Sequence, residues 1–210
     1  MNRIPRPEIP RKAVYRLSVY FRGLQQLKAN GIATVSSEAL AKASGVKPTQ
    51  LRKDLAYFGQ FGTRGLGYDV GQLAEMISDV LGTTHLRPVI LVGVGNLGLA
   101  LLSYRGFQKE GFEIIAAFDL EPRRRRGKDI PVPIHALTEM PAVIREREVK
   151  MAILTLPASA AQEVANTLVQ CGITGILNFA PLVLDVPEQV VVNNVNLAIE
   201  LENLSYFVRR

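Results

Sequence analysis

The feature that most constrains the fold of this 210-residue chain is the stretch VILVGVGNLGLALL, residues 89–102. An apolar run typical of a strand leads through a glycine motif into a segment with helical spacing. Gly93, Gly95 and Gly98 match G-x-G-x-x-G. In that motif the first glycine makes a tight turn, the second lets a pyrophosphate approach the backbone, and the third lets helix and strand pack closely. The N–H groups at the helix start would face the phosphates, so the stretch predicts a dinucleotide cradle.

The chain after Pro88 alternates short apolar runs with segments of helical spacing. Strands that alternate with helices are joined by right-handed crossovers and form a parallel sheet. The predicted strands cover 89–93, 113–119, 132–135, 149–155, 175–179 and 190–195. The predicted helices cover 96–104, 138–147 and 159–171, and the tail NLAIELENLSYFVRR forms one more, with an apolar stripe of Leu197, Leu201, Leu204 and Val208.

A carboxylate ends the second predicted strand. Asp119 stands 21 residues after Gly98, where an acidic side chain accepts hydrogen bonds from the ribose hydroxyls of a dinucleotide. Arg123–Arg126 follow directly and could hold a 2′-phosphate. Because Asp119 would repel that phosphate, the pattern favours NAD(H) over NADP(H), and we interpret the arginine run as a solvated basic loop.

The residues needed for catalysis with such a cofactor are missing from the pattern. A dehydrogenase needs a general acid or base near the nicotinamide, usually His, Lys or Tyr. His85 lies in a linker and His135 in an apolar strand. We interpret Cys171 as a structural thiol. Because it is the one cysteine of the chain, a disulfide framework and a multi-cysteine metal site are excluded. The pattern therefore indicates nucleotide sensing without catalysis and without a metal.

Positive charge is concentrated in the first part of the chain. Residues 1–85 contain 12 Lys and Arg against 6 Asp and Glu, whereas residues 86–210 contain 13 of each, so the net charge of +6 belongs to the first segment. This asymmetry is typical of a protein that binds DNA, and it is also compatible with ordinary solubility. We expect a cytoplasmic protein, because the pattern shows no signal peptide and no apolar run of about 18 residues.

The first segment has the pattern of a winged helix–turn–helix domain. Helical spacing extends over 11–30 and 71–82. Between them, a short helix (37–43) and a second helix (48–58) form a recognition pair. The glycine-rich stretch 59–70 predicts a turn-rich hairpin, which would be the wing.

Basic and polar side chains gather on the second helix of this pair and on the wing. Arginine and lysine read guanine O6 and N7, and glutamine reads adenine. An arginine at a wing tip can reach the minor groove or the phosphates. The predicted DNA-contacting residues are Lys47, Thr49, Gln50, Arg52, Lys53, Tyr57 and Arg64. The alternative for these charges is a solvated helix face.

Four segments resemble one family. The run LRKDLAYFGQFGTRGLGYDV, residues 51–70, resembles the signature of the Rex family of redox-sensing transcriptional repressors. SYRGFQ is similar to the family's Y-x-G-F segment, GILNFAP to its Asn-Phe-Ala-Pro strand end, and VVVNNVNLAIEL to the entry of its last helix. The resemblance extends from about residue 11 to residue 208.

The resemblance implies a homodimeric repressor that binds inverted-repeat operators when NAD⁺ prevails and releases them when NADH binds. It implies an α/β fold in which a winged helix–turn–helix domain (1–85) precedes a parallel-sheet Rossmann domain (86–195) and a helix swapped between protomers (196–210). From the motif and the resemblance together, the expected dinucleotide-binding residues are Gly93, Val94, Gly95, Asn96, Leu97, Gly98, Tyr104, Asp119, Thr155, Pro157, Asn178, Phe179 and Ala180.

The resemblance also implies a redox-dependent contact set. It joins Arg16 on the first helix, Tyr104, and the residue before the last helix, which is Asp in the family and Asn196 here. An amide still forms hydrogen bonds, but it has no charge to pair with Arg16. The next position is often Phe in the family and is Leu197 here. The alternative role for Tyr104 and Arg16 is simple interface packing.

Two other functions stay open at this point. One is an NAD-dependent oxidoreductase with a basic N-terminal domain, which would need the acid or base that the pattern lacks. The other is an architectural DNA-binding protein with a vestigial Rossmann fold. Asp119 argues against it, because a vestigial site needs no ribose acceptor.

Overall fold

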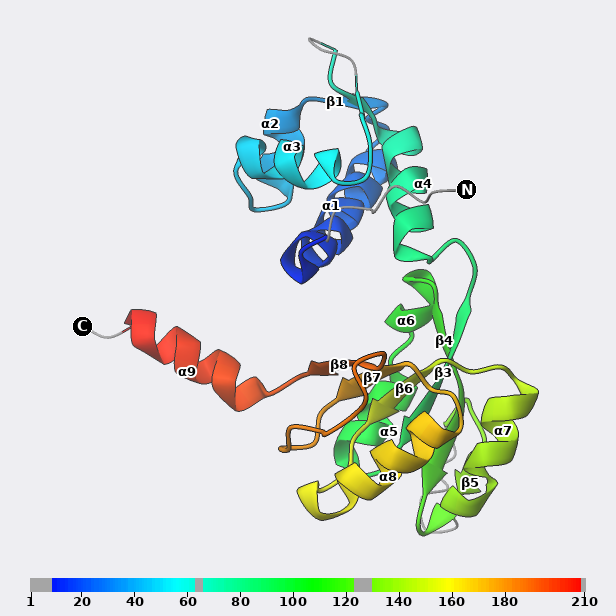
Figure 1. Cartoon of the computed structure of the whole chain (residues 1–210). Coiled ribbons are helices and arrows are strands. Elements are labelled where there is room, and N and C mark those ends of the chain that lie inside the picture. The colour runs from blue at the N-terminus through cyan, green and yellow to red at the C-terminus, as the bar shows by residue number, and fades with distance from the viewer. Residues whose placement is uncertain (1–8, 63–65, 123–129, 209–210) are drawn as a thin grey trace, which may run out of the picture. The chain divides into compact units, whose positions relative to one another are not determined.

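The computed structural model of the chain describes residues 9–62, 66–122 and 130–208. The chain divides into two compact units, Met1–His85 and Leu86–Arg210 (Figure 1). Arg64 at the predicted wing tip and the arginine run Arg123–Arg126 lie outside the described residues. None of the described helices has the length and hydropathy that crossing a bilayer requires.

The described part of the first unit consists of helices and a small sheet. The helices are α1 (Arg11–Ala29), α2 (Ser37–Ala43), α3 (Pro48–Ala56) and α4 (Val70–Leu81), which confirms the helices predicted there. Their starts follow from local chemistry: the Ser36 hydroxyl accepts a hydrogen bond from the Ala39 N–H at 3.1 Å, and Pro48 occupies the first turn of α3. Leu17, Tyr20 and Leu24 of α1 are fully buried in the core of this unit.

The wing segment is described only in part, because residues 63–65 lie outside the described residues. Its strand β2 (Tyr68–Asp69) pairs antiparallel with β1 (Thr34–Val35), which precedes α2, a pairing that the sequence did not predict. Gly67 explains the pairing: it has φ +86°, and a Cβ there would overlap the Val35 carbonyl oxygen. Only glycine permits this close approach of two backbones.

A six-stranded parallel sheet forms the second unit, in the order β5-β4-β3-β6-β7-β8. It confirms all six predicted strands. Their bounds are β3 (Arg87–Val92), β4 (Phe112–Asp119), β5 (Ile134–Ala136), β6 (Met151–Leu154), β7 (Gly175–Asn178) and β8 (Val191–Asn194). The helices are α5 (Asn96–Ser103), α6 (Gly106–Lys109), α7 (Met140–Glu146), α8 (Ala158–Gln170) and α9 (Leu197–Val208), and a 3₁₀ turn (Leu137–Glu139) precedes α7.

The two faces of the sheet are covered unequally. Ile90 and Val92 of β3 lie in one cluster with residues of α7 and α8, whereas Val89 and Leu91 lie in another with Leu102 of α5. This alternation is the period-2 pattern of a strand that is buried on both faces. On the α5 face, Met151, Leu177 and Phe179 stay only partly buried.

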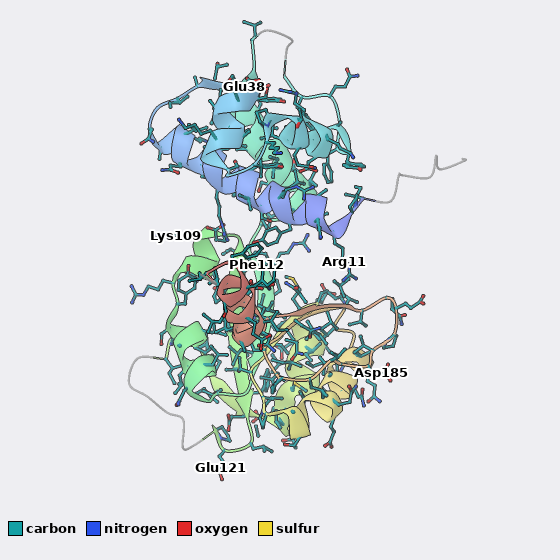
Figure 2. The ribbon with its side chains drawn as sticks, turned by 90° about the vertical axis from the view of Figure 1, so that its left-hand side faces the viewer. Arg11, Glu38, Lys109, Phe112, Glu121 and Asp185 are labelled. Carbon is teal, nitrogen blue, oxygen red and sulfur yellow. The ribbon has the colours of Figure 1, made fainter. Side chains whose placement is uncertain are left out.

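The carboxyl ends of the parallel strands share one edge of the sheet. Figure 2 labels Phe112 at the start of β4 and Glu121 just beyond its end, at opposite edges of the unit. The loops after β3, β4, β6 and β7 therefore meet at the Glu121 edge, which is where ligands bind in open α/β sheets. Helix α9 is separate from this arrangement, because each of its residues is exposed.

Candidate nucleotide and DNA sites

The glycine loop after β3 has the geometry that each glycine was predicted to supply. Gly93 has φ +100°, and a Cβ there would lie 2.6 Å from the Thr155 carbonyl oxygen. A Cβ on Gly98 would overlap the Gly93 carbonyl oxygen. At Gly95, in contrast, a Cβ would meet nothing within 4 Å. Packing within the protein thus requires glycine at positions 93 and 98, whereas Gly95 faces open space.

Asp119, the last residue of β4, is hydrogen-bonded to the glycine loop. Its Oδ2 accepts a hydrogen bond from the Val94 N–H at 2.7 Å, and its Oδ1 accepts one from the Glu121 N–H at 2.9 Å. Each carboxylate oxygen can accept a further hydrogen bond. Asp119 is half-buried beside the glycine loop, so its carboxylate keeps some exposure to solvent in addition to its bond to Val94.

Thr155, which directly follows β6, is hydrogen-bonded to the same loop. Its hydroxyl donates to the Gly93 carbonyl oxygen at 2.5 Å. Pro157 is exposed and precedes the first residue of α8. Asn96 and Leu97 are exposed in the first turn of α5, beside the open space at Gly95. The strand-end residues predicted around the cradle are therefore together at one edge.

The side chain of Asn178 is bound within the protein. It is fully buried: its Nδ2 donates to the Leu182 carbonyl oxygen and to Asn194 Oδ1, both at 2.8 Å, and its Oδ1 accepts from the Ala180 N–H at 3.0 Å. Through these hydrogen bonds the Asn178 amide stabilises the turn after β7. Ala180 is buried and Phe179 packs on the α5 face, so this segment would contribute backbone and ring surface rather than the Asn178 amide.

Tyr104 directly follows α5. The eight-residue helix α5 carries the chain from the glycine loop back toward the opposite edge of the sheet, about 12 Å away. There Tyr104 is 60% exposed, and its ring contacts that of Phe107 edge to face, with ring centroids 5.1 Å apart. Tyr104 lines a cavity of about 510 Å³ together with Phe112 and Val132, and no residue of the glycine loop lines it. Within one chain, the length of α5 separates Tyr104 from the glycine loop, and its role in dinucleotide binding stays a prediction.

These features fit a dinucleotide. The space at Gly95 admits a pyrophosphate, the first turn of α5 offers backbone N–H groups, and Asp119 offers acceptors for a ribose. Within the part of the chain that the structure describes, no group of His, Cys, Asp and Glu is arranged to hold a metal ion.

The predicted DNA-contacting residues of α3 fall into two groups. Lys47, Thr49 and Lys53 are exposed. Arg52 and Gln50 are already held by the protein: Arg52 Nη1 donates to Ser37 Oγ at 2.7 Å and lies 3.3 Å from Glu38 Oε1, and Gln50 Nε2 donates to Asp54 at 2.8 Å. Glu38, which Figure 2 labels, is itself exposed. Tyr57 is partly buried at the C-cap of α3.

Arg16, predicted as part of a redox-dependent contact set, has a partner that the sequence pattern did not reveal. Its Nε and Nη2 donate to the two carboxylate oxygens of Asp54 at 2.5 and 2.6 Å. The Tyr20 hydroxyl donates to Asp54 as well. A sequence signal existed: Arg16 and Tyr20 are four residues apart on α1, as are Gln50 and Asp54 on α3, so each pair shares a helix face.

Asn196 and Leu197 lie at the start of α9. The Asn196 side chain caps this helix, because its Oδ1 accepts from the Ala198 N–H at 3.0 Å. Leu197 is 64% exposed. The amide at position 196 thus has a local structural role whatever it contacts beyond this chain.

Comparison with known proteins identifies both units. Residues 8–56 match the family model described as a putative DNA-binding protein N-terminus, and residues 84–182 match the one described as a CoA-binding domain. The redox-sensing transcriptional repressor Rex of Pelotomaculum thermopropionicum is 45% identical over 95% of this chain and 93% of its own length. Rex of Syntrophobacter fumaroxidans is 47% identical over 95% of both chains.

Solved structures agree with these relatives. The structure of RSP in complex with β-NAD⁺ and operator DNA has a TM-score of 0.88 and 35% identity, over 95% of this chain and 92% of RSP. The structure of RSP in complex with β-NADH has a TM-score of 0.84 and 34% identity, over 96% and 94% of the two chains. Relatives of this similarity, matched over nearly their whole length, show that the chain belongs to the Rex family of redox-sensing transcriptional repressors.

Proposed function

We propose that this protein binds operator DNA when NAD⁺ prevails and releases it when NADH occupies the glycine cradle. The observation that carries the proposal is the match of 95% of the chain to RSP bound to both β-NAD⁺ and operator DNA. Since the relatives are repressors, the oxidoreductase alternative is set aside. The dinucleotide supplies no chemistry to a reaction, and its redox state is the signal.

The exposed residues of α3 support the DNA half of the proposal. The N-terminal residues of a recognition helix contact base edges, and here Lys47 and Thr49 occupy those positions with solvent-exposed side chains. Lys53, one turn later, suits a phosphate contact. DNA binding of this kind loses affinity steeply with salt, because phosphate contacts release counterions. A repressor that acts on DNA in this way would be cytoplasmic.

The loops at the carboxyl edge of the sheet support the nucleotide half. The pyrophosphate would lie against Gly95 and the N–H groups of Asn96 and Leu97, and the adenosine ribose would bind Asp119. Thr155 would keep the loop closed through Gly93. NAD(H) is favoured over NADP(H), because a 2′-phosphate would stand next to the Asp119 carboxylate.

The exposed apolar surface of α9 supports a homodimer. Leu201, Leu204 and Phe207 are 66%, 61% and 81% exposed, and apolar side chains exposed together in this way mark an interaction surface. We propose that α9 packs on a second copy of this chain, as a swapped helix. Two copies related by a two-fold axis would place two α3 helices in successive major grooves, so the operator would be an inverted repeat.

The experiment that tests the proposal is an electrophoretic mobility shift with an inverted-repeat duplex, titrated separately with NADH, NAD⁺ and NADPH. CoA serves as a control for a ligand that shares only the ADP portion. The expected result is release by NADH, retention with NAD⁺, and a weak effect of NADPH and CoA. Equal retention with NADH and NAD⁺ would refute sensing, and the architectural alternative would then account for any DNA binding.

A further inference from the structure

Asp54 is an unusual residue to find on a recognition helix. Its side chain is fully buried, and it is the one charged residue among the buried polar residues that the structure describes. Both oxygens are satisfied: Oδ2 accepts from Arg16 Nε and the Tyr20 hydroxyl, and Oδ1 accepts from Arg16 Nη2 and Gln50 Nε2. Three of these four bonds come from α1 and the fourth from α3 itself.

Burial and the hydrogen-bond donors around Asp54 determine its charge state. Burial raises the pKa of the carboxyl, but the hydrogen bonds from Arg16, Tyr20 and Gln50 and the Arg16 charge outweigh burial and hold the pKa below its ordinary value of 3.8. The hydrogen bond to Asp54 raises the pKa of Arg16 further. Asp54 is therefore an ionised carboxylate at neutral pH, and an ionised carboxylate can only accept hydrogen bonds.

This restricts the orientation of Gln50. A glutamine amide can usually turn over, because its oxygen and nitrogen ends have the same shape. Here Gln50 must direct Nε2 toward Asp54 Oδ1, at 2.8 Å, because the reverse orientation would place two acceptors together. Its Oε1 then points away from Asp54 and has no partner among residues 9–62, 66–122 and 130–208, and the side chain is partly exposed.

We propose that Asp54 is a positioning residue for base recognition: it orients the Gln50 amide so that Oε1 faces the major groove and selects adenine. Adenine offers an N6 amine to Oε1 and an N7 acceptor to the second Nε2 proton. Guanine offers acceptors at both places, thymine an acceptor and a methyl group, and cytosine an amine without the N7 acceptor. Arg16 and Tyr20 hold Asp54 from α1 and so fix this orientation before DNA binds. This inference rests on the proposed DNA-binding function.

The test uses the full-length protein and a duplex selected by it from randomised inverted repeats. Each base pair of one half-site is then replaced in turn, and affinities are measured at one salt concentration. We expect one adenine position at which replacement weakens binding by about 5- to 150-fold, the range of one bidentate contact. Gln50→Met should abolish the preference at that position alone, because it removes the amide and leaves Asp54 paired with Arg16.

Asp54→Asn tests the positioning role, and Tyr20→Phe is its matched control. The Asp54→Asn substitution replaces a group that only accepts hydrogen bonds with an amide that both accepts and donates, so Gln50 is no longer restricted to one orientation and the adenine preference should fall toward that of Gln50→Met. Tyr20→Phe removes one bond to Asp54 but keeps the Arg16 pair and the Gln50 contact, so it should lower stability and keep the preference. A purely structural Asp54 would lower affinity for every duplex in proportion, and that result would overturn the proposal.

A measurement on the unmodified protein covers the case in which Asp54→Asn fails to fold. In NMR spectra of the wild type, one Gln50 side-chain amide proton should be shifted downfield and exchange slowly, because it is bound to a buried carboxylate. Two Gln50 amide protons that both behave as in free glutamine would overturn the proposal. Failure of the proposed function looks different, since the wild type would then select no inverted repeat at all.

Discussion

Replacing Gly95 with alanine should separate nucleotide binding from folding. The backbone there has φ −78° and ψ −165°, an extended conformation that alanine adopts freely, and the added Cβ meets nothing within 4 Å. Two small effects on stability oppose each other. Alanine is a poorer N-cap than glycine for α5, and it also lowers the entropy of the unfolded chain, and each effect is under about 1 kcal/mol. The melting temperature should stay within about 3 °C of the wild type.

Nucleotide affinity should change far more. The Cβ occupies the space where the pyrophosphate would approach the backbone, so one or two charge-assisted hydrogen bonds would be lost or lengthened. Such bonds contribute about 1.5–3 kcal/mol each, and a total loss of about 2–4 kcal/mol corresponds to about 30- to 1,000-fold weaker NADH binding. NADH fluorescence titration and thermal melting on the same preparation measure both quantities.

Gly98→Ala is the matched control. Its Cβ would overlap the Gly93 carbonyl oxygen and lie 3.1 Å from Thr155 Oγ1, so this variant should lose stability, by about 1–3 kcal/mol, as well as affinity. A Gly95→Ala protein that melts normally and binds NADH within about threefold of the wild type would refute the placement of the pyrophosphate at Gly95.

Three further outcomes are expected. Thr155→Val removes the hydroxyl that holds the Gly93 carbonyl oxygen, so it should cost about 1 kcal/mol of stability and weaken NADH binding; calorimetry that finds neither change would contradict the clamp. The pKa of Asp54 is lowered by its partners, so its contribution to folding is complete above its ordinary pKa of 3.8 and is lost as pH falls through the lower folded value. Urea unfolding should therefore show that the wild type loses stability in acid and that Asp54→Asn loses less. The variant should already be about 3–5 kcal/mol less stable than the wild type at neutral pH. An equal loss of stability in acid for both proteins would contradict this account. Leu204→Glu places a charge on the exposed stripe of α9, and it should shift the protein from dimer to monomer in sedimentation and weaken operator binding by at least tenfold, about 1.4 kcal/mol; an intact dimer would remove α9 from the interface.

Much of the fold could be predicted from the sequence, because its signals are local. Apolar runs bounded by glycine and proline indicated the six strands, and helical spacing with Ser36 and Pro48 at the helix starts indicated the recognition pair. The partner of β2 could not be found in this way. It depends on the close approach of Gly67 to Val35, two residues that are far apart in the chain.

The candidate site could be predicted from the sequence at the glycines, because each of them has a single structural role in the motif. Gly93, Gly95 and Gly98 each have the surroundings that the motif requires. Asn178 and Arg16 were placed by resemblance, and the structure shows that hydrogen-bonding partners within the chain already satisfy both side chains. A polar side chain can serve the fold or a ligand with the same atoms, and only its neighbours in space decide between them.

The affinity of NADH for the protein, measured with and without saturating operator duplex, tests most directly that the two sites are coupled. Because coupling is reciprocal, DNA that is released by NADH must in turn weaken NADH binding. We predict a weakening of about 5- to 150-fold, which corresponds to a coupling free energy of about 1–3 kcal/mol. An NADH dissociation constant unchanged by the operator would show that the protein has two independent sites and no redox switch.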